Sequence, residues 1–202
     1  MIIATIENVL SDNLYKHVYS TLNGTNMSWQ MVDDISGSTK DEKTLAIQEA
    51  AGVVDRKPMY GFGFNFCVPN AGVVNLVDFQ MLYPILANAT SAADIRIDEV
   101  ILGRAFLTLP LPYKIDLKQG AHIDRDEPHL VCLYYLTDHQ DDPSAETSFF
   151  ASKDDLTIVD SYRPKANSAI IFDGQQYHVG GHPTKDKRMI INFCFRGSKN
   201  GS

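Results

Sequence analysis

The spacing of apolar positions along the chain changes near residue 94. Before that point, apolar residues recur once per helical turn in two segments. This spacing predicts a helix that starts at Ser11 or Asp12 and stops at Gly24, and a second helix over 78–91. Pro84 predicts that the second helix bends or begins there. Short strands are expected around these helices, over 1–10, 28–32 and 61–68, with a polar loop over 33–43.

After residue 94 the chain consists mostly of short runs rich in Ile, Val, Phe and Tyr, separated by Gly, Pro, Asp and Asn. Such runs are typical of strands joined by turns. Seven strands are predicted, over 95–109, 113–117, 129–137, 147–152, 156–162, 168–172 and 188–196. Their number and length favour a sandwich or barrel. We expect one mainly β domain over 1–202, with a helix and strand buttress (1–94), a β core (95–197) and a disordered tail (198–202).

Composition and charge exclude several classes of protein. The 202 residues are 44% hydrophobic, enough to bury a core. The net charge is -7 and no run of Lys and Arg forms a basic stripe, which argues against a nucleic-acid partner. No apolar run approaches the roughly 18 residues of a membrane span, and the acidic start does not look like a secretory leader. Three widely spaced cysteines, Cys67, Cys132 and Cys194, predict reduced thiols and a cytoplasmic location.

His122 and Asp124 stand two positions apart, just before a long apolar strand. Side chains at i and i+2 of an extended chain point to the same side. If that side faces a pocket, the pair can bind a metal. If it faces solvent, the pair has no function, and a single His-x-Asp is common in surface turns.

His178 and Arg188 extend this pair into a larger polar series. Two imidazoles and one carboxylate on one face of a metal leave positions open, which suits non-haem Fe(II) oxygenases. Arg188 begins the last strand and shares a face with Ile190 and Asn192. A buried unpaired charge costs several kcal/mol, so Arg188 needs a partner. A carboxylate of a dicarboxylate ligand would supply one.

The order His-x-Asp, the "YYLT" strand, His178 and a basic residue ten positions later resembles the 2-oxoglutarate/Fe(II)-dependent dioxygenases, in particular their prolyl 4-hydroxylase-like branch. The resemblance covers roughly residues 95–197. It implies a double-stranded β-helix (a cupin-like jelly roll) with N-terminal helices packed on one sheet. It also implies Fe(II), 2-oxoglutarate and O2 as cofactors, with ascorbate as an optional reductant. The implied reaction is hydroxylation of a peptidyl or free amino acid, with proline first, and release of succinate and CO2.

The resemblance assigns roles residue by residue. It makes His122, Asp124 and His178 the iron ligands and Arg188 the residue that binds the distal carboxylate of 2-oxoglutarate. Further contacts to this co-substrate are expected from Tyr135, Tyr113 and Asn192, with Tyr135 the better matched of the two tyrosines. The substrate rim is expected to include His129, Arg125 and His182. His182 also competes with His178, but it lies only six residues before Arg188, in a turn of glycines and a proline.

Two departures from the family pattern border the expected substrate entrance. The "YYL" strand often starts with an arginine in relatives, whereas here "EPHLV" brings His129 to that region. The usual glycine pair before the next strand is replaced by "SAETSFF". Both departures leave the metal set intact and make the substrate the open question. The acidic segment 138–146 is expected to be a solvated loop that could act as a lid.

Three functions compete on this sequence. The leading one is the dioxygenase, acting on a peptide or on a small molecule. The second is a jelly-roll module that binds a metal or ligand without catalysis. The third is a cupin-like metal enzyme of other chemistry, which would not explain Arg188. Nothing in the sequence indicates an oligomeric state.

Overall fold

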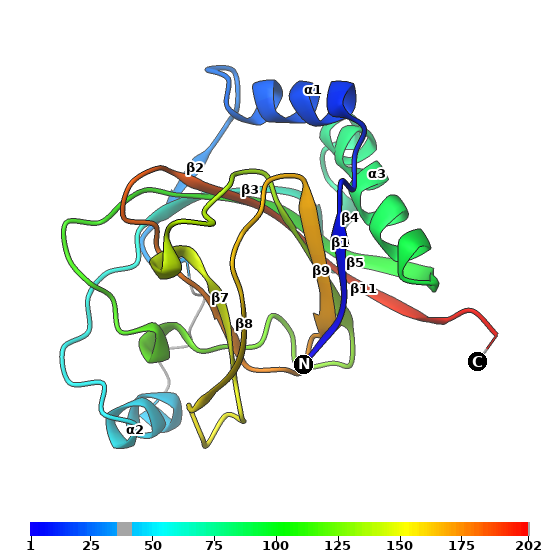
Figure 1. Cartoon of the computed structure of the whole chain (residues 1–202). Helices are drawn as coiled ribbons and strands as arrows, with labels where there is room; N and C mark the ends of the chain where they lie inside the picture. The colour runs from blue at the N-terminus through cyan, green and yellow to red at the C-terminus, as the bar shows by residue number, and fades with distance from the viewer. Residues whose placement is uncertain (36–41, 202) are drawn as a thin grey trace.

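The structure is a computed structural model that describes residues 1–35 and 42–201, with only the backbone of Lys43 (Figure 1). Among these residues the strands form two antiparallel sheets. The larger sheet has the order β1-β9-β6-β11-β5-β3-β2, with β4 paired to β3. Its strands are β1 (Ile2–Glu7), β2 (Gln30–Val32), β3 (Gly61–Val68), β4 (Gly72–Val73), β5 (Ile95–Thr108), β6 (Leu130–Tyr135), β9 (Ser168–Asp173) and β11 (Arg188–Lys199). The smaller sheet has the order β10-β7-β8, formed by β7 (Thr147–Phe150), β8 (Ile158–Tyr162) and β10 (His178–Gly180).

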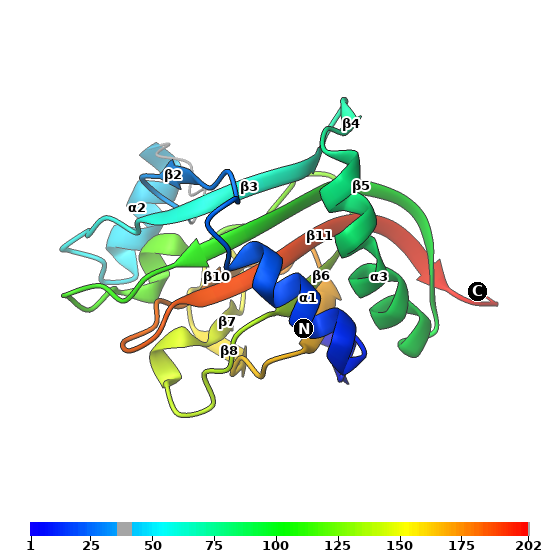
Figure 2. The same cartoon turned by 90° about the horizontal axis from the view of Figure 1, so that it is seen from above.

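Strand β11 shows why the chain forms two packed layers. It pairs with β5 on one side and β6 on the other (Figure 2). Successive side chains of a strand point to opposite faces. On one face Met189, Ile191, Phe193 and Phe195 belong to the main core cluster, while Cys194 on the other face belongs to a second cluster. The predicted division of this strand into two faces is confirmed.

Two helices cover the outer face of the larger sheet. They are α1 (Asp12–Leu22) and α3 (Leu76–Ala92), and Figure 1 shows them together at one end of the molecule. Their buried residues join the apolar face of β11 in the main core cluster. Burial of this apolar surface is the main stabilising term, at roughly 25 cal/mol per Å². The prediction of N-terminal helices packed on one sheet therefore agrees with the structure.

Several expected boundaries were wrong. The helix predicted over 78–91 is present as α3, but it does not begin at Pro84, because the Asn75 side chain accepts a hydrogen bond from the backbone N–H of Asp78 and caps the helix well before the proline. The predicted strand 113–117 is absent, since prolines precede it and Asp116 caps the 3-10 helix η1 (Leu117–Gly120). The start of the expected tail, 198–199, pairs with β5 as the end of β11.

The remaining differences lie in the N-terminal half and in the acidic segment. Most of the loop expected over 33–43 falls outside the described residues, and helix α2 (Glu42–Ala50) follows it at the end of the molecule opposite α1 and α3 (Figure 1). The N-terminal half also gives β1, β2, β3 and β4 to the larger sheet itself. The acidic segment is not a simple solvated loop. It contains a short 3-10 helix, η2 (Pro143–Ala145), and the buried Asp142 accepts hydrogen bonds from the backbone and hydroxyl of Thr184. No helix in the described part of the chain is long and apolar enough to cross a membrane.

Candidate metal centre

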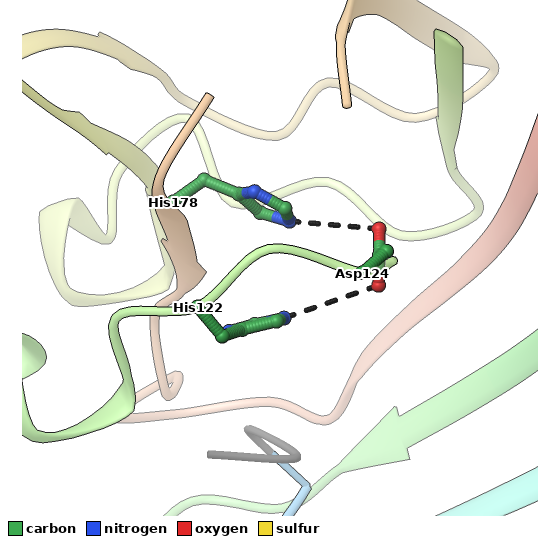
Figure 3. A group of neighbouring side chains, drawn as sticks. All are labelled: His122, Asp124 and His178. Atoms are coloured by element: carbon green, nitrogen blue, oxygen red, sulfur yellow. Dashed lines mark ion pairs between the residues drawn. The ribbon is translucent and has the colours of Figure 1, made fainter. Parts of the chain in front are cut away.

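A short backbone pairing brings two histidines together. His122 lies in the segment after η1, and His178 begins β10. Each backbone N–H of the pair donates to the other's carbonyl, at 3.0 and 2.9 Å, which forms an isolated antiparallel bridge. The two imidazole rings therefore lie side by side, with centroids 4.7 Å apart. Asp124 follows two residues later on the same chain segment and faces both rings (Figure 3).

The ligand atoms of these three residues all lie within 4.8 Å of one another. Nε2 of His122 is 4.0 Å from Oδ1 of Asp124, and Nε2 of His178 is 3.7 Å from Oδ2 (Figure 3). Nδ1 of His122 donates to the Gly120 carbonyl at 2.7 Å, and Nδ1 of His178 donates to the Gln176 carbonyl at 2.9 Å. Because Nδ1 carries the proton in each ring, Nε2 presents a bare lone pair toward the carboxylate. The set fits a divalent metal held by two histidines and one carboxylate.

The electrostatics of the group favour the same protonation states. Burial lowers the pKa of His178 to about 4, assisted by the neighbouring His122, so its imidazole is neutral at pH 7. Burial by itself would raise the pKa of Asp124, but Arg104, the two histidines and Asn192 together hold it well below its usual value. Metal ligands must be a neutral histidine and an ionised carboxylate, and these are the forms present.

Arg104 was missed by the sequence reasoning. It lies on β5, and its guanidinium makes an ion pair with Oδ1 of Asp124, whose side chain is 0% exposed. From the neighbouring strand β11, the Asn192 amide donates to Oδ2 at 3.1 Å. Asn192 was expected to contact a co-substrate carboxylate, whereas here it holds the carboxylate of Asp124. An arginine between apolar neighbours in the segment 95–109 was the available signal.

A cavity opens beside the three candidate ligands, and Arg188 lies in its wall. Arg188 is only 3% exposed, and its Nη2 donates to the Thr147 hydroxyl at 2.9 Å. Its Nε has no hydrogen-bond partner among the described residues, and no described carboxylate makes an ion pair with it. The cavity therefore has a metal-type ligand set on one side and an uncompensated cation on the other. Its remaining lining is mostly apolar and includes Ile35, Met59, Phe106, Leu133 and Ile190.

The two predicted tyrosines differ in position. Tyr135 is fully buried under the guanidinium of Arg188, which lies 5.7 Å from its ring centre, and its hydroxyl donates to the Thr147 hydroxyl at 2.8 Å. Tyr135 therefore supports the arginine from beneath. Tyr113 lies outside the cavity, because the chain around it is irregular and its hydroxyl donates to the Pro58 carbonyl at 3.1 Å. The structure does not bring Tyr113 to the co-substrate position.

The three residues expected at the substrate rim do not line this cavity. Arg125 pairs with Glu127 in a separate surface pocket. His182 is buried and lies with Tyr113 along a second groove. His129 is buried over Gly174, and its Nδ1 donates to the Glu127 carbonyl at 2.8 Å.

The far side of Asp124 holds a second group of potential ligands. His129, Cys194 and Asp124 have ligand atoms within 4.8 Å of one another, and Nε2 of His129 has no partner among the described residues. Burial raises the pKa of the Cys194 thiol well above its usual value, and the nearby Asp124 adds to this. A protonated thiol is a poor metal ligand. The thiols of Cys67 and Cys132 are also free and buried, as predicted.

Comparison with known proteins identifies the fold. No protein-family model matches the sequence, and no curated protein matches it. Among solved structures, a viral collagen prolyl hydroxylase from Paramecium bursaria Chlorella virus-1, in a 2-oxoglutarate complex, is 12% identical with a TM-score of 0.51, over 96% of this chain and 94% of that one. A Pseudomonas putida prolyl-4-hydroxylase is 11% identical with a TM-score of 0.50, over 96% and 91%. The alpha-ketoglutarate-dependent epimerase SnoN of nogalamycin biosynthesis is 10% identical with a TM-score of 0.52, over 95% and 77%.

The chain has the fold of the 2-oxoglutarate/Fe(II) oxygenases. The predicted jelly-roll class is thereby confirmed, and the resemblance to the prolyl 4-hydroxylase-like branch holds at the level of fold. At 10–12% identity the likeness does not extend to activity or substrate. Those have to be argued from the residues of the cavity.

Proposed function

We propose that this chain is an Fe(II)- and 2-oxoglutarate-dependent dioxygenase that hydroxylates its substrate and releases succinate and CO2. One observation carries the proposal. The buried Arg188 has no described acidic partner and lines the same cavity as His122, Asp124 and His178. A metal site alone would not require that cation, and a dicarboxylate that reaches from the metal to the arginine would account for both.

The three candidate ligands would hold the iron. Their Nε2 and carboxylate atoms converge, while their backbone partners fix the orientation of both rings. When bound, Fe(II) and 2-oxoglutarate together supply the O2-dependent oxidation. The chain's own part is to keep the histidines neutral and the carboxylate ionised, and to exclude bulk water from a cavity with mostly apolar walls.

Arg188 would orient the co-substrate. Its planar guanidinium can bind a carboxylate through two parallel N–H groups. The hydroxyl of Thr147 already accepts from both Arg188 and Tyr135, and this fixes the guanidinium over the tyrosine ring. A co-substrate held in this way would present its keto-acid end to the metal ligands.

The substrate is proposed to be a peptidyl or free amino acid, with a proline-like side chain first. Prolyl hydroxylases among the structures of this fold support that choice. A small metabolite is the alternative, supported by the epimerase of nogalamycin biosynthesis that has the same fold. The apolar lining from Ile35, Met59 and Phe106 suits the aliphatic ring of a proline-like side chain.

Metal and co-substrate binding test the proposal directly. Mn(II) binding can be counted from the EPR signal of the free ion, and 2-oxoglutarate binding to the Mn(II)-saturated protein can be followed by calorimetry. We expect one metal per chain, with 2-oxoglutarate binding that depends on the metal. His178→Ala should lose the metal, Arg188→Ala should lose only 2-oxoglutarate, and the matched surface variant Arg196→Ala should lose neither.

Turnover separates the competing functions. With Fe(II) and O2, the dioxygenase proposal predicts slow succinate formation from 2-oxoglutarate, accelerated by proline-containing peptides, by free amino acids or by a small metabolite. Binding of both ligands without any succinate would favour the non-catalytic module. Metal binding that is indifferent to 2-oxoglutarate would reject the dioxygenase and favour other cupin-like chemistry.

A further inference from the structure

Asp124 is the candidate ligand whose orientation is not fixed by hydrogen bonds within its own chain segment. His122 and His178 are fixed by their mutual bridge and by hydrogen bonds from Nδ1 to backbone carbonyls. Asp124 lies in a segment without helix or strand, two residues past the bridge. Its side chain is nevertheless 0% exposed. A carboxylate in this position needs partners from elsewhere in the fold to define its orientation.

Two neighbouring strands of the larger sheet supply those partners. Arg104 on β5 and Asn192 on β11 are direct cross-strand partners, so their side chains rise from the same place on the sheet. The Arg104 guanidinium binds Oδ1 of Asp124, and the Asn192 amide donates to Oδ2 at 3.1 Å. Each oxygen has one donor from the sheet, so the carboxylate cannot rotate about its Cβ–Cγ bond without breaking a contact.

Arg104 is itself held in place. Its guanidinium carbon lies 4.9 Å from the centre of the Phe106 ring, a cation–π contact within the same strand. Its side chain is 24% exposed and lines the cavity beside the candidate ligands. A charged group fixed by packing on a strand is a more exact anchor than one on a loop.

We propose that Arg104 is a positioning residue for the metal centre, which holds Oδ1 of Asp124 so that Oδ2 is presented to the metal beside His178. The inference rests on the proposed function, since it requires that Asp124 is a metal ligand. Oδ2 lies 3.7 Å from Nε2 of His178. Its hydrogen-bond donor is the neutral amide of Asn192, on β11. The charged donor is on the other oxygen, so metal and arginine need not compete for the same lone pair.

The positive charge of Arg104 has an opposite effect on metal affinity. A guanidinium beside Asp124 repels a divalent cation, and on that ground alone its removal would tighten metal binding. Outer partners that orient a ligand change metal affinity by about 10–100-fold when they are removed. Because Arg104 binds Oδ1 and the metal would use Oδ2, we expect orientation to dominate and the metal affinity to fall.

Mn(II) titration followed by EPR tests this on the intact chain. We expect Arg104→Met to bind Mn(II) about 10–100-fold more weakly than wild type. Arg104→Lys keeps the charge and one donor, so its affinity should lie between the two. The matched control Arg196→Met removes a surface arginine that pairs with Glu99 further along the same two strands, β11 and β5, and should change the affinity less than about twofold. Once saturated with Mn(II), Arg104→Met should still bind 2-oxoglutarate, which Arg188→Ala should not, because Arg188 is unchanged.

Each result is decisive. Equal or tighter Mn(II) binding by Arg104→Met would overturn the positioning role while leaving the dioxygenase proposal intact. If Arg104→Met does not fold, Arg104→Lys provides the test. A weaker Mn(II) affinity, or a changed EPR line shape of the bound Mn(II), would support the positioning role. Wild-type affinity together with a wild-type line shape would overturn it. Failure of wild type to bind Mn(II) would overturn both proposals.

Discussion

Replacing Arg188 with methionine is expected to stabilise the ligand-free protein and abolish its binding of 2-oxoglutarate. Arg188 is 3% exposed, and no carboxylate among the described residues makes an ion pair with it. Burial lowers its pKa, which means that the charged form is destabilised in the folded chain. Methionine has a similar length, no charge and a flexible side chain that fits irregular space. The variant would therefore be more stable than wild type but unable to bind 2-oxoglutarate.

The magnitude follows from the contacts of the guanidinium. Its hydrogen bond to Thr147 at 2.9 Å stabilises by about 1.5–3 kcal/mol, and its desolvated contact with the Tyr135 ring adds about 2 kcal/mol. Against these stands the cost of dehydrating a buried ion, which is several kcal/mol. Replacement of a buried ion pair by apolar residues is often neutral or stabilises by about 1–4 kcal/mol, and Arg188 lacks even the paired charge that would offset its dehydration. We expect a gain of about 1–3 kcal/mol, which in a domain of this size raises Tm by several degrees, at about 2–4 °C per kcal/mol.

Thermal unfolding with and without ligands measures both effects. In the presence of Mn(II), 2-oxoglutarate at 100 times its Kd should stabilise wild type by about 2.7 kcal/mol and Arg188→Met not at all. Arg196→Met, which loses an exposed ion pair with Glu99, should change the free energy of unfolding by at most about 1 kcal/mol. A ligand-free Arg188→Met that unfolds below wild type would show that the arginine is structural. Undiminished stabilisation by 2-oxoglutarate would show that it does not bind the co-substrate.

Three further predictions concern stability, each measured by urea denaturation. The metal-free protein should lose stability as pH falls from about 6.5 to about 4, because the unfolded chain takes up a proton near the usual pKa of His178, 6.5, while burial keeps the folded pKa at about 4. His178→Gln should flatten that dependence, and an unchanged slope would contradict the assignment. Gly181→Ala should cost about 1–3 kcal/mol, because a Cβ there would lie 2.1 Å from the Ser144 carbonyl oxygen, and a neutral effect would refute the clash. Phe193→Ala should cost about 3–5 kcal/mol, since the ring is fully buried and packs edge-on against Phe66 at 5.4 Å, and a loss below about 1 kcal/mol would place it outside the core.

The part of the fold that was predictable is the part set by strand periodicity. In β11 an apolar residue occupies every second position from Met189 to Phe195, and a period of two fixes which side chains share a face. The face of Met189 and Phe195 must be buried against other apolar residues, and helices α1 and α3 pack against it. The pattern also placed Arg188 and Asn192 on the opposite face, where the cavity lies.

Predictions from composition failed where local capping decided the structure. The segment 113–117 contains Tyr and Ile, which favour a strand. The structure instead has an irregular stretch and then a 3-10 helix capped by the Asp116 side chain. The same irregular stretch leaves Tyr113, whose expected role came from the family resemblance, outside the cavity. Residue type alone does not determine whether a segment forms a strand or where its side chains point.

Arg104 and Arg188 are both arginines within apolar strands, and each therefore required a partner that sequence periodicity cannot name. The partner of Arg104 is Asp124, which comes within reach only because β5 pairs with β11 and the segment after His122 folds back over that pair. Among the described residues, no carboxylate makes an ion pair with Arg188. Arg104 thus pairs with the protein's own carboxylate, whereas Arg188 has no acidic partner among the described residues. This difference, visible only in the folded chain, is the reason we propose that Arg188 binds the carboxylate of a ligand.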